Sequence, residues 1–281
     1  MELDNFTSQF KSAFKEGFNY SEVKVSNICL ITSLGIEHSK RTQENVSSLL
    51  PEYSEQYEWS ILLDSQFASI QDMLKQIEIC KPDLIVVERA IKTPEQDILY
   101  GLSPYIETIT QVINTPILLL PANGLNLPSD KSKDTKILVA AHHLIDSQGL
   151  INWGVFFAKP NGQIYLNHIE DRHTFKRYIE VIEKIPEIDS DIATKTIYDE
   201  LLKLPTEFIE TVRNELASKF PEIEILGLVK ISHALSEIKH AMEGKEIDLL
   251  IVNSKDPSHL AMDAMSYECA IEFKNKHILM L

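Results

Sequence analysis

The chain has 281 residues, of which 44% are hydrophobic and 25% charged, and this composition excludes a disordered chain. A prior of about 150 residues per domain predicts two domains. Acidic residues outnumber basic ones by 42 to 27, and the formal net charge of −15 disfavours binding to nucleic acid or to an anionic membrane surface.

The N-terminus and the cysteines indicate a cytoplasmic protein. The opening MELDNFTSQF lacks the basic and apolar regions of a signal peptide, and no apolar run approaches the ~18–20 residues of a membrane helix. Cys29, Cys80 and Cys269 are odd in number, far apart and set in apolar patterns. We therefore expect reduced thiols that pack in the core.

Short apolar runs alternate with helical patterns along the whole chain. The predicted strands are 27–32, 59–63, 83–87, 116–120, 136–141, 164–169, 223–229, 248–252 and 277–281. The predicted helices are 69–80, 104–113, 148–159, 206–220, 234–242 and 262–273. Because the strands are mostly apolar on both faces, the pattern predicts an α/β fold with doubly wound, mainly parallel open sheets of Rossmann type.

The two halves of the chain resemble each other. KPDLIVVERA (81–90) corresponds to EIDLLIVNSK (246–255), and TPILLL (115–120) corresponds to KHILML (276–281). We predict a domain at 1–121, a linker at 122–135 and a second domain at 136–281, with their two sheets in tandem. The acidic and Lys-rich segment from Ile182 to Leu204 is interpreted as an insertion, either a solvated face or a partner-binding segment.

Residues 136–171 are similar to the opening strand, helix and second strand of the universal stress protein family, here in a tandem two-domain form. The matching positions are Ser147, Trp153, Ala158, Lys159 and the L-x-H-I at 166–169. The resemblance implies a fold like that of the adenine-nucleotide alpha-hydrolases. The first half shows four strands where the family has five. It lacks either the second strand and its helix or, if the chain starts at a helix (5–16), the first strand. Both alternatives give a four-stranded sheet with 27–32 near its centre.

Many members of the family bind ATP through an acidic residue after the first strand and a glycine-rich loop after the fourth, and both motifs are degenerate here. His142 stands at the acidic position, and the loop 253–268 contains no glycine. Glycines allow backbone N–H groups to approach phosphates closely, so their absence weakens the cradle. The loop of the first half, 88–103, has only Gly101. We expect no firmly bound cofactor, with ATP as an alternative.

In an open α/β sheet the ligand crevice lies at the carboxyl ends of the strands. The residues predicted to line it in the second half are Ala141, His142, His143, His168, Asn253, Ser254 and Ser266. His142 and His168, with Asp146 or Asp171, are candidate ligands for Zn²⁺; the alternative is that these histidines fill a polar turn and a strand. No catalytic residue is predicted, because the set Ser254, His142 and Asp146 lacks a G-x-S-x-G elbow.

The sequence thus predicts a universal-stress-type protein, non-enzymatic on balance, that acts through a partner protein or a small ligand in the second-half crevice. The alternatives are an ATP-binding, weakly ATP-hydrolysing protein and a metal-binding variant. The final strands of the halves, from Pro116 to Leu120 and from His277 to Leu281, are apolar edges that need covering. We expect them to pair or pack as an intrachain pseudo-dimer, and a homodimer is a further expectation.

Overall fold

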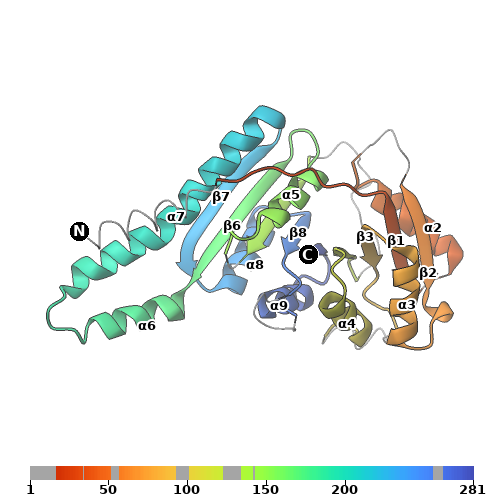
Figure 1. Ribbon diagram of the computed structural model, residues 1–281, viewed down its shortest axis with the longest axis horizontal. Coiled ribbons are helices and arrows are strands. Elements are labelled where there is room, and N and C mark those ends of the chain that lie inside the picture. Colours follow the sequence, from red (N-terminus) through yellow and green to blue (C-terminus); the bar gives the residue numbers. More distant parts are fainter. Residues whose placement is uncertain are drawn as a thin grey trace.

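The computed structural model describes residues 17–33, 35–51, 57–92, 101–122, 134–141, 143–255 and 262–281. Within these residues one sheet runs through the molecule, with helices on both faces (Figure 1). Its strands are β1 (Asn27–Thr32), β2 (Glu58–Leu63), β3 (Leu84–Val87), β4 (Ile117–Leu119), β5 (Lys136–Ala141), β6 (Gln163–Asp171), β7 (Glu224–Ser232), β8 (Leu249–Val252) and β9 (His277–Met280).

The helices of the described residues alternate with these strands. They are α2 (Ile36–Ser47), the short 3₁₀ helix η1 (Asp64–Gln66), α3 (Ile70–Cys80), α4 (Pro104–Val112), α5 (Gln148–Phe157), α6 (Arg172–Ile182), α7 (Ser190–Lys219), α8 (Ala234–Gly244) and α9 (Ala264–Glu272). Ser103 caps α4 with its side chain and Pro104 follows at the first helical position, as predicted. The sequence pattern did not predict α2, and it placed the start of α7 about fifteen residues too late.

The strand order is β2-β1-β3-β4-β9-β8-β5-β6-β7. All neighbours are parallel except β4 and β9, so the doubly wound, mainly parallel class is confirmed. The expected two tandem sheets are, however, one continuous sheet. It is continuous because β4 and β9 would each expose an unpaired edge, and they pair antiparallel with Leu118 opposite Leu279.

The strand pairing also shows how the first half departs from the second. In the second half β5 lies between β6 and β8, and in the first half β1 lies between β2 and β3. The strands β2, β3 and β4 therefore correspond to β6, β8 and β9, and β7 has no counterpart among the described residues. Neither predicted alternative matches the described residues, in which the first half has counterparts of the first and second strands and lacks an outermost one. The predicted helix 5–16 lies outside the described residues.

Two apolar layers, one on each face of the sheet, cross the junction between the halves. One layer contains side chains of α2, α5 and α7, and the other contains side chains of α3, α4, α8 and α9. Along a strand the side chains alternate between these layers: Leu118 and Leu279 face the first, and Ile117 and Ile278 face the second. The division at 122–135 stays a prediction, and residues 123–133 of that linker lie outside the description.

Helices α6 and α7 form a hairpin that projects from one end of the sheet (Figure 1). The 30 residues of α7 correspond to about 45 Å at the usual rise of an α-helix. Its second half packs on the sheet through Phe208, Ile209 and Val212, whereas its first half contacts α6, with the rings of Phe175 and Tyr198 6.1 Å apart. We call residues 172–204 the arm; it contains the segment predicted as an insertion.

An extended N-terminal segment, residues 17–25, lies along the second half of α7 before it leads into β1 (Figure 1). The Phe18 amide donates to Thr211 Oγ1 at 3.0 Å, and the Phe18 ring meets Phe208 edge-on. Tyr20 stands edge-on to Phe220 with ring centroids 5.0 Å apart. These contacts hold α7 against the body of the protein.

The three cysteines are free thiols, as expected. Burial raises the pKa of both Cys29 and Cys269 to about 12, so these thiols stay protonated at neutral pH. Among the described residues, the helices are too short or too polar for any of them to cross a membrane.

Gly162 occupies the turn before β6 because a side chain does not fit there. A Cβ at this position would lie 2.7 Å from Thr135 Oγ1 and 2.8 Å from the Lys159 carbonyl oxygen. We expect Gly162→Ala to lower the free energy of unfolding by about 1–3 kcal/mol, measured by urea denaturation. Gly244→Ala is the matched control, since no atom lies within 4 Å of its added Cβ. Equal losses for the two variants would contradict the steric explanation.

Candidate functional site

A crevice of about 480 Å³ lies where β5 and β6 end and α7 passes over them. Parallel strands expose their carboxyl ends at one edge, and a ligand is expected at such an edge. The residues that line it are His143, Leu144, Ile145 and Asp146 after β5, His168 and Glu170 of β6, and Ile197, Glu200, Leu201, Leu204 and Pro205 of α7. The crevice therefore combines the predicted strand ends with a helical wall that the sequence did not predict.

The charged side chains that line the crevice are acidic. Three carboxyl groups, those of Asp146, Glu170 and Glu200, stand among apolar side chains, and no Lys or Arg is found in this described lining. Carboxylates attract cations and hydrogen-bond donors and repel phosphates. The site is therefore suited to a ligand with an apolar body and a positively charged group.

His168 is the most buried polar residue of the crevice, with 3% of its surface exposed. It faces Ala141 across the β5–β6 ladder, and its Nε2 lies 2.9 Å from Glu170 Oε1. The two side chains meet because residues two apart on a strand share a face. An ionised carboxylate only accepts, so Nε2 carries the proton of this bond. Nδ1 is buried and has no hydrogen-bond partner among the described residues.

The predicted metal site is only partly covered by the description. His142 lies outside the described residues, and the carboxyl group of Asp171 is the N-cap of α6. Asp171 caps α6 by accepting from the Thr174 amide at 2.7 Å, and that bond lowers the pKa of its carboxyl group. Within the residues that the structure describes, no three His, Cys, Asp or Glu side chains are grouped to hold a metal ion. Zinc binding stays a prediction.

The predicted serines make hydrogen bonds inside the chain. The amide and hydroxyl groups of Ser254 both donate to the Leu281 carbonyl oxygen, at 2.5 and 2.6 Å. The hydroxyl group of Ser266 is paired with the Asn253 carbonyl oxygen and with Asp263 Oδ2. Both serines are nearly fully buried. Their hydroxyl groups hold the β8–α9 loop and the end of β9 together.

Asp263, which sequence reasoning missed, caps the N-terminus of α9. Its carboxylate accepts from the Ser266 amide at 2.9 Å. A helix N-terminus attracts anions, and here the buried side chain of Asp263 occupies that position. The Asn253 side chain, close by, donates to Ser147 Oγ at 3.3 Å, which links the β8 end to the start of α5.

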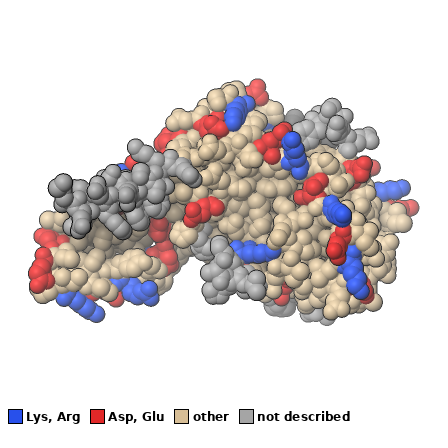
Figure 2. Space-filling view, in the orientation of Figure 1, with Lys and Arg blue, Asp and Glu red and all other residues tan. Residues whose placement is uncertain are grey.

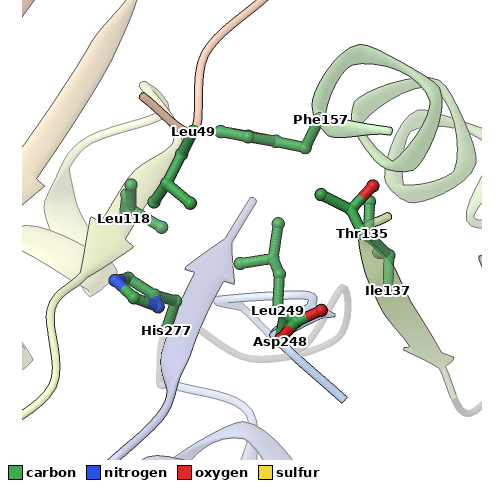
Figure 3. A pocket seen from close by; sticks show the side chains of 8 residues that line it. All are labelled: Leu49, Leu118, Thr135, Ile137, Phe157, Asp248, Leu249 and His277. Carbon is green, nitrogen blue, oxygen red and sulfur yellow. The ribbon is translucent and has the colours of Figure 1, made fainter. Parts of the chain in front are cut away.

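A second, smaller cavity lies at the opposite edge of the sheet, between the halves (Figure 3). It has a volume of about 30 Å³ and is lined mainly by apolar side chains, among them Leu118, Leu249 and Phe157. The imidazole of His277 also lines it. This cavity has room for about one water molecule, so it is a feature of packing and not a ligand site.

Comparison with known proteins returns structural neighbours only. No protein-family model and no curated protein sequence matches the chain. A universal stress protein from Archaeoglobus fulgidus is 11% identical, with 91% of this chain and 85% of that one covered and a TM-score of 0.49. A functionally unknown protein from Pseudomonas aeruginosa is also 11% identical, with 92% of each chain covered and a TM-score of 0.47.

Proposed function

We propose that the chain is a non-enzymatic protein of the universal stress type that binds a small ligand with an apolar body and a cationic group. The observation that carries this proposal is the crevice at the ends of β5 and β6, with three carboxyl groups set among apolar side chains. A ligand amine would sit near Asp146, Glu170 and Glu200. The apolar part would pack on Leu201 and its neighbours on α7.

The class of protein is supported by two independent features. The similarity of residues 136–171 to the family falls on β5, α5 and β6, and β6 and the segment after β5 line the crevice. The strand pairing of the second half, with β5 between β6 and β8, repeats in the first half. Fold alone does not define a function, so the ligand is inferred from the site.

Three features weigh against the ATP-binding alternative. The loop after β8 contains no glycine, the hydroxyl groups of Ser254 and Ser266 bond within the chain, and Asp263 places a carboxylate at the N-terminus of α9. A triphosphate there would meet a negative charge in place of a backbone cradle.

The test is a thermal-shift titration of the full chain with hexylammonium as the cationic probe and hexanoate as its charge-reversed match. A ligand at ten times its dissociation constant adds about 1.4 kcal/mol to stability, so Tm should rise by a few degrees with hexylammonium alone. Glu200→Gln should reduce that rise. Glu207→Gln, which removes an exposed charge of the same helix, should leave it unchanged.

Other results of the same titration would overturn the proposal. A Tm shift with Mg·ATP and none with hexylammonium would move the protein to the ATP-binding class. A shift with Zn²⁺ that His168→Ala abolishes, again without a hexylammonium response, would instead support the metal-binding variant. Equal shifts with hexylammonium and hexanoate would show that charge does not select the ligand.

A further inference from the structure

The arm concentrates most of the large apolar side chains that the described structure exposes. Seven of the ten such side chains lie between residues 178 and 204: Tyr178, Val181, Ile185, Ile188, Ile192, Tyr198 and Leu204. The other three are scattered over α2, α3 and α4. Leu204 belongs to the crevice, and the remaining six lie nearer the free end of the arm. Grouped exposed apolar side chains of this kind mark an interaction surface.

Packing within the arm does not cover these side chains. Helices α6 and α7 meet through the ring contact of Phe175 with Tyr198, and Phe175, Ile179 and Ile182 of α6 are partly buried. Tyr178 and Val181 lie on a flank of α6 beside that contact and stay more than half exposed. Ile192 on α7 is 67% exposed. The arm thus has an apolar surface beyond the one that joins its two helices.

The charge of the arm differs from that of the rest of the chain. Residues 172–204 contain six basic and seven acidic residues and carry a net charge of −1, against −15 for the whole chain. The two signs are separated along the arm. Helix α6 has Arg172, Lys176 and Arg177 against Glu180, whereas residues 183–191 have four acidic residues against Lys184. Figure 2 shows the basic side chains along α6 and acidic ones at the free end.

We propose that two copies of this chain associate through their arms, side by side and antiparallel about a twofold axis. In that arrangement the acidic free end of one arm lies against the basic α6 of the other, and the same contact occurs twice. The exposed apolar side chains of both hairpins are then buried in a four-helix assembly. The rest of the molecule is strongly acidic and repels a second copy, whereas the nearly neutral arm does not.

The size of the arm sets the expected strength of the dimer. Residues 190–204 of α7 span about 22 Å, and two packed helices are about 20 Å wide. Such a surface is at or below the ~800 Å² that each partner buries in a standard complex. The dimer should therefore form and dissociate with concentration instead of being permanent. The proposal does not depend on the crevice ligand.

Sedimentation velocity of the full chain between 1 and 300 µM tests the proposal. The mass should rise with concentration from 32.0 kDa to twice that value. Ile192→Asp should raise the dissociation constant at least tenfold. The matched control is Ile79→Asp, an equally exposed isoleucine on α3, and it should leave the constant unchanged. Urea denaturation of both variants checks that each is folded.

A charge exchange tests the antiparallel arrangement separately. Arg177→Glu should weaken the dimer, and adding Glu187→Arg should restore it, because each new charge then meets its opposite on the other arm. A monomer at every concentration would overturn the proposal. So would a dimer that Ile79→Asp weakens as much as Ile192→Asp, since the contact would then not be in the arm.

Discussion

Replacing Arg89 by methionine should lower the free energy of unfolding by about 3 kcal/mol, measured by urea denaturation at pH 7. Arg89 is 4% exposed and lies two residues after the end of β3. Its guanidinium group donates to the carbonyl oxygens of Leu120 at 3.0 Å, Ala270 at 2.5 Å and Phe273 at 3.4 Å. Arg89 therefore joins the end of β4 in the first half to the C-terminus of α9 in the second.

Methionine has a similar volume but no donor, so three carbonyl groups lose a charge-assisted partner in a buried place. A positively charged side chain is also stabilised near the negative C-terminal end of a helix such as α9. Burial lowers the pKa of Arg89 to about 9, and the group is still charged at pH 7. The methionine variant no longer has to bury a positive charge, and this gain offsets part of the loss. We therefore expect the free energy of unfolding to fall by about 3 kcal/mol, which is less than the sum of the three hydrogen bonds.

The matched control is Arg213→Met on α7. The Arg213 Nε donates to the Ile225 carbonyl oxygen at 2.9 Å, but 38% of the side chain is exposed, so water can replace the bond. We expect a loss within about 1 kcal/mol for this variant. If Arg89→Met costs no more than Arg213→Met, Arg89 does not hold the halves together.

His277 should make the protein less stable as the pH falls below about 6.5. The imidazole stands at the start of β9, lines the smaller cavity and is bonded to the Asp248 backbone (Figure 3). Burial, and then the charge of Arg89, lowers its pKa from 6.5 to about 4. Above pH 6.5 the ring is neutral in both states. Between pH 6.5 and pH 4 the unfolded chain binds a proton that the folded chain does not, so stability is lost.

The size of this effect follows from the two pKa values. A shift from 6.5 to about 4 implies a loss of about 2 kcal/mol between pH 7 and pH 4.5. Urea denaturation over this range should therefore show a steeper decline for the natural chain than for His277→Asn, which does not titrate. His240→Asn, which removes an exposed imidazole, should keep the natural slope. Parallel declines for the natural chain and His277→Asn would contradict the prediction.

Much of the fold was predictable because its strands are local patterns. Each of the nine predicted strands is present, and those at Asn27–Thr32 and Lys136–Ala141 have the predicted bounds. Helix α2 was missed because its buried positions include Ser39 and Thr42, so it has no apolar stripe. Helix α7 was expected to begin at 206, directly after Pro205, and proline lacks the amide that an interior helical position uses. It begins instead at Ser190, with Asp189 as its cap.

The site was predictable in part for the same reason. The rule that ligands lie at strand ends placed His143 and His168 in one crevice, and Glu170 could have been added because it shares a strand face with His168. The wall formed by Ile197, Glu200 and Leu201 could not have been added. These residues lie some thirty positions further along the chain, on a helix whose path over the strand ends depends on the arm.

The sequence by itself determined the type and order of most elements, the doubly wound class and the absence of glycine from residues 253–268, because periodicity and composition act within a few residues. The sequence also led us to expect that β4 and β9 pair or pack, but only the tertiary structure decided that their antiparallel pairing makes one continuous sheet, that Arg89 bridges the halves and that α7 covers the crevice. A local pattern tells which face of a strand or helix is buried. It does not tell which distant backbone or side chain covers that face, because many partners satisfy the same apolar surface.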